Sequence, residues 1–322
     1  MKHNTILITG GSGYIGSHLV KRLCSEGYTV VVYDLVAPHQ TLVRHLHYVY
    51  GDIRDGPSIQ EAMERWGAQI VVHLAARGMM AVNTADRHEQ ESVNVAGTKS
   101  VIEAVAQSGC RRLVFASSAA VYGESDRPLT ESSLLAPKSV YGKTKKIGEE
   151  MISDAIKARR ISAATLRMFN VAGNNPDVLL RPATDKRQSL LTNAANAIRA
   201  NTALVIYGRD YKTPDGSAVR DYVHIEDVID ATIRAMRFLM TTDKPIITNI
   251  GSGASTTNLA AARWMERFAN RRLKLRFLPR RPSEIGQSVS DNTYAKNMLQ
   301  WRPHQSDIQI ITLSVCKHYG LA

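Results

Sequence analysis

The sequence predicts an α/β protein, with a Rossmann-like doubly wound parallel sheet and a smaller α/β substrate-binding domain. The chain has 322 residues, which is enough for two domains. Strand and helix patterns alternate through its first half, and such alternation is typical of a parallel sheet with helices on both faces. The first strand, at residues 6–9, runs directly into a glycine-rich turn and then a helical pattern. We therefore expect a dinucleotide site near the start of the chain.

The glycine-rich turn reads Gly10-Gly11-Ser12-Gly13-Tyr14-Ile15-Gly16. Its glycines let the backbone pass close to a pyrophosphate, and the following helix offers free N–H groups and positive partial charge. Asp34 comes at the end of the second strand, residues 28–33, where a carboxylate can accept hydrogen bonds from both ribose hydroxyls and repels a 2′-phosphate. These features predict NAD as the cofactor, bound by Gly10, Gly13, Tyr14, Ile15, Gly16 and Asp34.

The carboxyl ends of the later strands supply the rest of the predicted crevice. A short strand at 48–51 is followed by Asp52-Ile53, which would lie against the adenine. The strand at 70–74 ends in His73-Leu74-Ala75-Ala76, where small residues allow the cofactor to approach. Asn94 precedes a helix at 95–108, and the strand at 112–116 leads to Ser118. Because ligands of open parallel sheets bind at the carboxyl ends of the strands, we expect these segments at one edge.

Tyr141 and Lys145 stand four residues apart at the start of a predicted helix, so their side chains lie on one face. A free tyrosine has a pKa of about 10 and is a poor base at neutral pH. A cation held close to the phenol favours the phenolate by roughly 1–3 pKa units. We therefore expect Lys145 to lower the pKa of Tyr141 and make it a general base towards a sugar or alcohol hydroxyl.

The bulk composition is ordinary except for its charge. Hydrophobic residues make up 44% of the chain, as in a soluble globular protein, and no apolar run is long enough to span a bilayer. The three cysteines have neither metal nor disulfide spacing, so we expect a cytoplasmic protein with no metal site. The formal charge of +12 is dispersed in short clusters such as Arg271-Arg272. We expect solvated surface and a few phosphate ligands, with no nucleic-acid or membrane partner.

Beyond these local features, the chain resembles the extended short-chain dehydrogenase/reductase family over nearly its full length, and within it the UDP-glucose 4-epimerase group. The resemblance rests on the glycine string, on Asn94, Ser118, Tyr141 and Lys145, and on Arg167-Met168-Phe169-Asn170. The most specific motif is the block 206–224, which contains Asp210-Tyr211, Asp215-Gly216 and Val219-Arg220-Asp221-Tyr222. Ala119 and Ala120 stand where the family's dehydratases carry an acidic pair, so elimination of water lacks its proton donor.

The resemblance implies a role for each matching residue. Tyr141 would take the proton from the sugar 4-hydroxyl, Lys145 would also hold the nicotinamide ribose, and Ser118 would hydrogen-bond the reacting oxygen. NAD would oxidise C4 and then reduce it again, so it would stay bound. The implied cofactor ligands further include Asp52, Ile53, Leu74, Ala75, Ala76, Asn94 and Phe169, and the implied UDP-sugar ligands include Asn170, Ser189, Tyr207, Arg220, Arg281 and Glu284. Tyr207 would support the uracil ring, and the two arginines would clamp the diphosphate.

The sequence departs from the epimerase pattern at three places. The segment after Asn170 is shorter, with Gln188-Ser189-Leu190 in place of a substrate-binding Asn-Asn-Leu, and it carries Arg187. Gly78 replaces a lysine near the nicotinamide, and the neighbouring Arg77 either substitutes for it or faces solvent. Ser288 stands where glucose-restricted members have a tyrosine, which leaves room beside C2 of the sugar. We therefore expect UDP-N-acetylhexosamines to be accepted as well as UDP-hexoses.

Two alternatives to a UDP-hexose 4-epimerase stay open. One is another sugar-nucleotide enzyme, such as a hexuronate or pentose epimerase or a reductase, because the altered segment would contact the sugar. The other is a non-catalytic NAD-binding scaffold, against which the intact set of Ser118, Tyr141 and Lys145 argues.

The second half of the chain completes the predicted organisation. We expect helices at 192–200, 224–240, 258–270, 291–301 and 308–319, and strands at 203–207, 246–250 and 273–278. Residues 1–170 would form the NAD-binding domain, with about 221–250 returning to it, and residues 171–322 would form the nucleotide-sugar domain. The resemblance also implies a homodimer, paired through the helices at 95–108 and 141–158.

Overall fold

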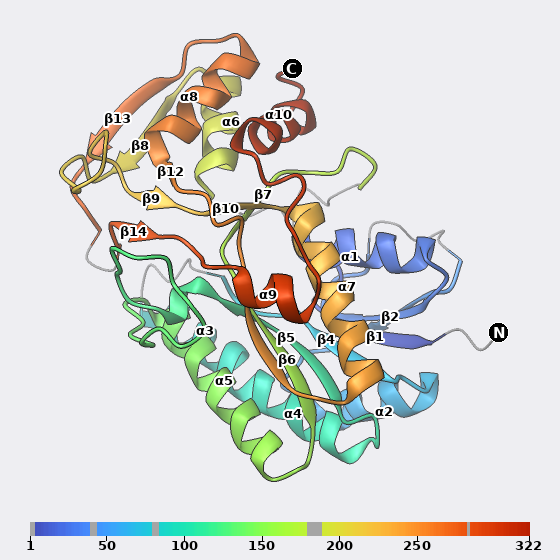
Figure 1. Ribbon diagram of the computed structural model, residues 1–322. Coiled ribbons are helices and arrows are strands. Elements are labelled where there is room, and N and C mark those ends of the chain that lie inside the picture. Colours follow the sequence, from blue (N-terminus) through green and yellow to red (C-terminus); the bar gives the residue numbers. More distant parts are fainter. Residues whose placement is uncertain (1–3, 39–43, 79–83, 179–188, 282–283) are drawn as a thin grey trace.

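A seven-stranded parallel sheet forms the centre of the computed structural model, which describes residues 4–38, 44–78, 84–178, 189–281 and 284–322 (Figure 1). Its strand order is β11-β6-β5-β4-β1-β2-β3. The strands are β1 (Thr5–Thr9), β2 (Thr29–Asp34), β3 (Leu46–Tyr50), β4 (Ile70–His73), β5 (Arg112–Ser118), β6 (Ser162–Met168) and β11 (Ile246–Ile250). The order reverses between β1 and β4, which is where doubly wound sheets bind ligands. The predicted fold class is confirmed.

Helices cover both faces of this sheet. Successive residues of β1 alternate between two cores, with Ile6 and Ile8 in one and Leu7 in the other. The first core includes residues of α1 (Tyr14–Ser25), α7 (Ile225–Thr242) and α9 (Thr293–Met298). The second includes residues of α2 (Gly56–Trp66), α4 (Gly97–Gln107) and α5 (Val140–Lys157). Burial on both faces explains why the strands are continuous apolar runs.

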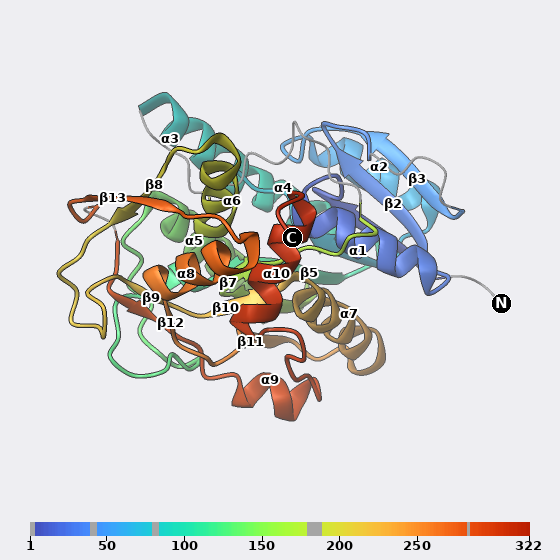
Figure 2. The ribbon, with the colours of Figure 1, turned by 90° about the horizontal axis from the view of Figure 1, so that it is seen from above.

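A third core lies outside the sheet and holds the second half of the chain together. Its helices are α6 (Leu190–Ala200), α8 (Asn258–Ala269) and α10 (Ile308–His318), which lie together in Figure 2. β8 (Ala203–Tyr207) and β13 (Lys274–Leu278) form a parallel pair beside these helices. The remaining short strands are β7 (Asn170–Ala172), β9 (Val219–Arg220), β10 (Tyr222–His224), β12 (Thr256–Thr257) and β14 (Gln287–Ser288), which pair as β7 with β10 and as β12-β9-β14.

One helical region differs from the sequence-based expectation. The predicted helix at 95–108 is preceded by α3 (Thr84–Glu91) and a π-helical turn, η1 (Ser92–Ala96), neither of which was predicted. Residues 84–91 read TADRHEQE, and only Gln90 of them is buried, so they present no apolar stripe from which a helix could be recognised. In the described part of the chain, no helix is long and apolar enough to cross a membrane.

Candidate active site

The glycine-rich turn lies between β1 and α1 at the reversal of strand order. A Cβ on Gly10 would lie 2.6 Å from the backbone nitrogen of Ala75, and Gly10 has a φ of +73°. Only glycine suits this position, where the turn meets the segment Leu74–Ala76 that follows β4. Gly13 is the N-cap of α1 and makes no side-chain capping hydrogen bond. The first turn of α1, which includes Tyr14, Ile15 and Gly16, thus offers backbone N–H groups suited to an anion.

Asp34 is held in place at the carboxyl end of β2. Its carboxylate accepts hydrogen bonds from the backbone N–H of Ser12 at 3.0 Å and of Val36 at 3.2 Å. Burial raises the pKa of Asp34, while these backbone hydrogen bonds oppose the rise. The carboxylate is therefore oriented toward the glycine-rich turn, as a ribose-binding acid requires.

The expected adenine contacts follow β3. Asp52 accepts hydrogen bonds from the guanidinium of Arg54, which lower the pKa of Asp52. Ile53 is buried, and a Cβ on Gly97 of α4 would lie 2.6 Å from its Cδ1. The Asp52 carboxylate is thus already paired, and Ile53 packs against α4.

Asn94 lies in the π-helical turn, and its side chain holds the segment after β4 by hydrogen bonds. Its Oδ1 accepts a hydrogen bond from the backbone N–H of Arg77 at 2.8 Å, and its Nδ2 donates to the Arg77 carbonyl and to Thr144 Oγ1, each at 3.1 Å. π-Helical turns are often found at functional sites. The Arg77 guanidinium is 61% exposed and lies 3.6 Å from Glu89. Arg77 is therefore exposed and adjacent to Glu89, and its substitution for the family's lysine stays a prediction.

Ser118, Tyr141 and Lys145 converge beside this crevice. Ser118 is the last residue of β5, and Tyr141 is the second residue of α5, which Ser139 caps. The helix can approach the turn after β5 because residue 142 is glycine, whose Cβ would lie 2.1 Å from the Ala120 carbonyl oxygen. Lys145 Nζ donates a hydrogen bond to the Ala116 carbonyl at 2.7 Å and lies 5.8 Å from the centre of the Tyr141 ring. The two side chains lie on one face of α5, as their spacing predicted, with Tyr141 half-buried and Lys145 buried.

The pKa values of this pair differ from the expectation. Burial raises the pKa of Tyr141 to about 12, and a hydrogen bond with Ser118 opposes the rise. Burial lowers the pKa of Lys145 to about 8, and the negative charge of Glu149 opposes that change. The expected lowering of the Tyr141 pKa is therefore wrong for the polypeptide by itself, because desolvation of the phenolate outweighs the hydrogen bond with Ser118.

Four of the expected UDP-sugar ligands come together from separate segments. Arg220 of β9 lies 3.4 Å from the carboxylate of Glu284, and burial raises the pKa of Glu284. The Arg281 guanidinium lies 3.6 Å above the centre of the Tyr207 ring at the end of β8. Both arginines are thus engaged by neighbouring protein groups.

The remaining expected ligands are distributed around this group. Phe169 is buried beside Tyr122, and Asn170 is exposed at the start of β7. Ser189 caps α6, since its Oγ accepts a hydrogen bond from the Thr192 N–H at 3.2 Å. Gln188 and Arg187 lie outside the described residues.

A buried ion pair behind the site was not predicted. Arg167 of β6 donates three hydrogen bonds to the Glu149 carboxylate, at 2.7–3.2 Å, and both side chains are about 5% exposed. Ser117 also donates to Glu149, at 2.5 Å. The available signal was that Glu149 follows Lys145 by four residues, on the same helix face as Tyr141. This network joins α5 to β6 and to β5, the strand that ends at Ser118.

Comparisons with known proteins agree with this geometry. Residues 6–251 match the sequence model of the NAD dependent epimerase/dehydratase family. A UDP-glucose 4-epimerase of Rhizobium meliloti (strain 1021) is 33% identical over 317 residues, covering 98% of this chain and 96% of the relative. The structure of a Brucella ovis UDP-glucose 4-epimerase in complex with NAD has a TM-score of 0.91 at 32% identity, with 98% of each chain covered. A Stenotrophomonas maltophila UDP-glucose-4-epimerase with bound NAD and formylated UDP-arabinopyranose also has a TM-score of 0.91, at 29% identity, with 99% of this chain and 98% of that chain covered.

Proposed function

Because this chain belongs to the NAD dependent epimerase/dehydratase family, we propose that it is an NAD-dependent 4-epimerase of UDP-hexoses. The observation that carries the proposal is the convergence of Ser118, Tyr141 and Lys145 at the carboxyl ends of the strands, beside the glycine-rich turn. A fold alone would not support an activity, but this set of side chains in this place does.

The crevice fits NAD. The glycine-rich turn and the first turn of α1 suit a pyrophosphate, and the oriented carboxylate of Asp34 suits a ribose without a 2′-phosphate. When bound, NAD supplies reversible oxidation of an alcohol to a ketone. The protein's own part is to hold the sugar and to move one proton at its 4-hydroxyl.

Tyr141 is the proposed proton carrier. Its phenol is hydrogen-bonded with Ser118, so a sugar 4-hydroxyl entering between them could exchange a proton with Tyr141 while Ser118 steadies the oxygen. Lys145 is buried one turn further along α5 and supplies positive charge close to the phenol when it is protonated. Removal of the proton from the sugar 4-hydroxyl by Tyr141 depends on this positive charge, because burial in the polypeptide alone keeps the Tyr141 pKa high.

The sugar range is a finer proposal. Ser288 lies in β14 directly opposite Arg220 in the parallel pairing with β9, and it is buried. A small side chain beside a proposed diphosphate ligand supports acceptance of UDP-N-acetylhexosamines. UDP-pentoses are a second candidate, because the Stenotrophomonas structure holds formylated UDP-arabinopyranose.

The division into domains, the assembly and the location are also proposals. We propose an NAD-binding domain of residues 1–170 with 221–250, supported by β11 as the outer strand of the main sheet, and a nucleotide-sugar domain built from the rest of 171–322. A homodimer through α4 and α5 is supported by Ile147 of α5, which is 39% exposed. A cytoplasmic location is supported by the three cysteines, which are all free thiols.

The test is to incubate the protein with a panel of UDP-glucose, UDP-galactose, UDP-N-acetylglucosamine and UDP-arabinose, and to identify the products by NMR. We expect inversion at C4 of the hexoses, with no net change in NAD. Tyr141→Phe, which keeps the ring and removes the hydroxyl, is the matched control. Absence of C4 inversion on every sugar, or equal turnover by Tyr141→Phe, would overturn the proposal.

A further inference from the structure

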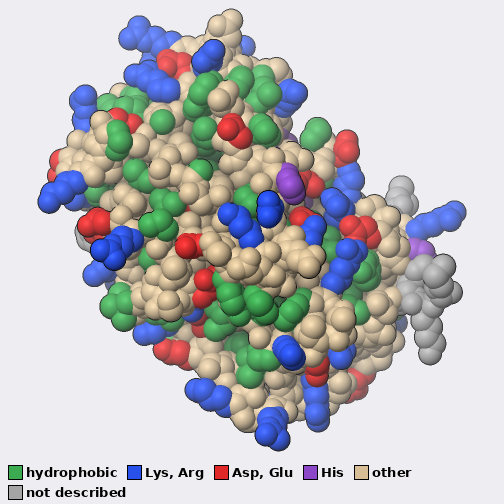
Figure 3. Space-filling view, in the orientation of Figure 1, with side chains coloured by type: hydrophobic (Ala, Val, Ile, Leu, Met, Phe, Trp, Pro, Cys, Tyr) green, Lys and Arg blue, Asp and Glu red, His purple; other side chains and the backbone are tan. Residues whose placement is uncertain are grey.

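The positive charge of this protein is concentrated in one segment of the fold. Residues 263–281 contain eight arginines and lysines but one acidic residue, Glu266, which gives a net charge of +7 out of the total of +12. The segment runs from α8 through β13. Lysine and arginine side chains surround this end of the molecule in the space-filling view (Figure 3). The expectation of dispersed charge therefore does not hold. Apart from Arg281, which is an expected diphosphate ligand, the proposed epimerase activity does not account for these cations.

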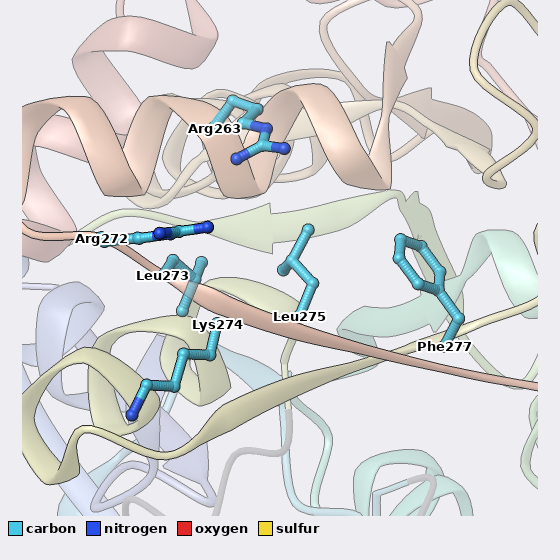
Figure 4. A pocket seen from close by; sticks show the side chains of 6 residues that line it. All are labelled: Arg263, Arg272, Leu273, Lys274, Leu275 and Phe277. Atoms are coloured by element: carbon cyan, nitrogen blue, oxygen red, sulfur yellow. The ribbon is translucent and has the colours of Figure 1, made fainter.

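An open groove of about 570 Å³ lies within this segment, between α8 and β13 (Figure 4). Leu273, Leu275 and Phe277 alternate along the chain and line one side of it, because alternate residues of a strand face the same way. Arg263 points from α8 toward the groove and is 59% exposed. Arg272 and Lys274 complete the lining. The groove thus has an apolar floor with cations around it. Of these, Arg263 forms an ion pair with Glu266 at 2.7 Å, and Lys274 Nζ donates a hydrogen bond to the Asn201 carbonyl at 3.2 Å.

β13 is also the edge of its sheet. Among the described strands it pairs only with β8, so its other edge presents backbone N–H and C=O groups. Such an edge is a template on which another extended chain can pair. A second copy of this protein is disfavoured there, because each copy would bring the same excess of positive charge. The excess of positive charge in residues 263–281 instead favours an acidic partner.

We propose that the free edge of β13 binds an extended acidic segment of a partner protein as an added strand. Alternate apolar side chains of that segment would enter the groove against Leu275 and Phe277, and its carboxylates would meet Arg263, Arg272 and Lys274. A single-stranded nucleic acid fits less well. The floor is mainly aliphatic, and the Arg209 guanidinium already lies 4.7 Å from the centre of the Phe277 ring, which restricts base stacking.

The test uses the full-length protein and a fluorescein-labelled ten-residue peptide of alternating glutamate and valine, followed by fluorescence anisotropy. We expect saturable binding, weakened at least about tenfold by the double variant Arg272→Glu/Lys274→Glu, which removes attraction and adds repulsion. The matched control is Lys244→Glu/Arg302→Glu, which makes the same change in net charge at exposed positions outside α4, α5 and the segment 263–281. Both double variants should keep the turnover of the parent enzyme.

The backbone pairing is tested separately with the same peptide, N-methylated at either its odd or its even positions. Since only one edge of an added strand pairs with β13, one of the two methylated peptides should lose binding and the other should keep it. Equal binding of the two methylated peptides, equal affinity for an oligothymidylate of the same charge, equal effects of the two double variants, or no binding of the parent peptide would each overturn the proposal.

Discussion

Replacing Lys145 by methionine should stabilise the protein against unfolding while abolishing its turnover. Lys145 is 4% exposed, and burial lowers its pKa to about 8, whereas the unfolded chain has the ordinary value of about 10.4. The folded protein therefore binds this proton less tightly than the unfolded chain does, which costs stability at any pH where the unfolded lysine is protonated. The difference between the folded and unfolded pKa values lowers the free energy of unfolding by about 3 kcal/mol below pH 8.

The pH dependence of this cost separates it from other effects of the substitution. As the pH rises above 8 the folded protein releases the proton while the unfolded chain keeps it, so wild-type stability increases relative to the variant. The difference in unfolding free energy between Lys145→Met and wild type should shrink by about 2 kcal/mol between pH 7 and pH 9.5. The variant also loses the hydrogen bond to the Ala116 carbonyl. This loss lowers the unfolding free energy by a roughly constant amount, because the carbonyl does not titrate over this pH range.

The assay is urea unfolding of both proteins after removal of bound nucleotide, at several pH values. Lys146→Met is the matched control, because the neighbouring Lys146 is 36% exposed and faces Glu150. The difference in unfolding free energy between Lys146→Met and wild type should show no comparable change with pH. A difference in unfolding free energy between Lys145→Met and wild type that is independent of pH would refute the assignment of a buried lysine with a lowered pKa to the active site.

Three further substitutions test the cofactor crevice, the buried ion pair and the sugar site. Gly16→Ala should weaken NAD binding and stability, because its Cβ would lie 2.3 Å from the Gly10 carbonyl oxygen. The control Gly56→Ala should change neither, because the nearest atom to that Cβ would lie at an ordinary distance of 3.6 Å, and equal NAD titrations of the two variants would contradict this. Arg167→Met should lower the unfolding free energy by about 3–5 kcal/mol in urea, because it leaves the Glu149 carboxylate buried without its partner, and a loss below about 1 kcal/mol would contradict this. Ser288→Tyr should reduce turnover of UDP-N-acetylglucosamine more than that of UDP-glucose in the NMR assay, and equal losses would exclude Ser288 as a determinant of sugar size.

The sequence was most informative where local pattern and backbone chemistry coincide. The glycine-rich turn, the position of Asp34 and the spacing of Tyr141 and Lys145 are all local, and the structure has the corresponding turn, strand end and shared helix face. The Arg167–Glu149 pair depends on the pairing of β5 with β6 and on the docking of α5, which sequence spacing does not report. The polar helix α3 lacked the apolar stripe on which helix prediction depends.

The pKa of Tyr141 could not be predicted for a different reason. Spacing showed that a cation is near, but the balance between attraction and desolvation depends on how deeply both groups are buried. The sign of the shift therefore comes from packing, and here packing keeps the proton on the phenol.

The two ends of the proposed site differ in how their ligand groups are held. At the cofactor end, Asp34 is fixed by backbone N–H groups that do not have to move, so binding costs little reorganisation. At the substrate end, Arg220 lies against Glu284 and Arg281 lies over Tyr207, so a diphosphate and a uracil ring must replace contacts within the protein. A diphosphate offers more negative charge than one carboxylate, whereas a neutral sugar offers none. It follows that the nucleotide half of the substrate must supply the energy to open these contacts, and that a free hexose should not be turned over.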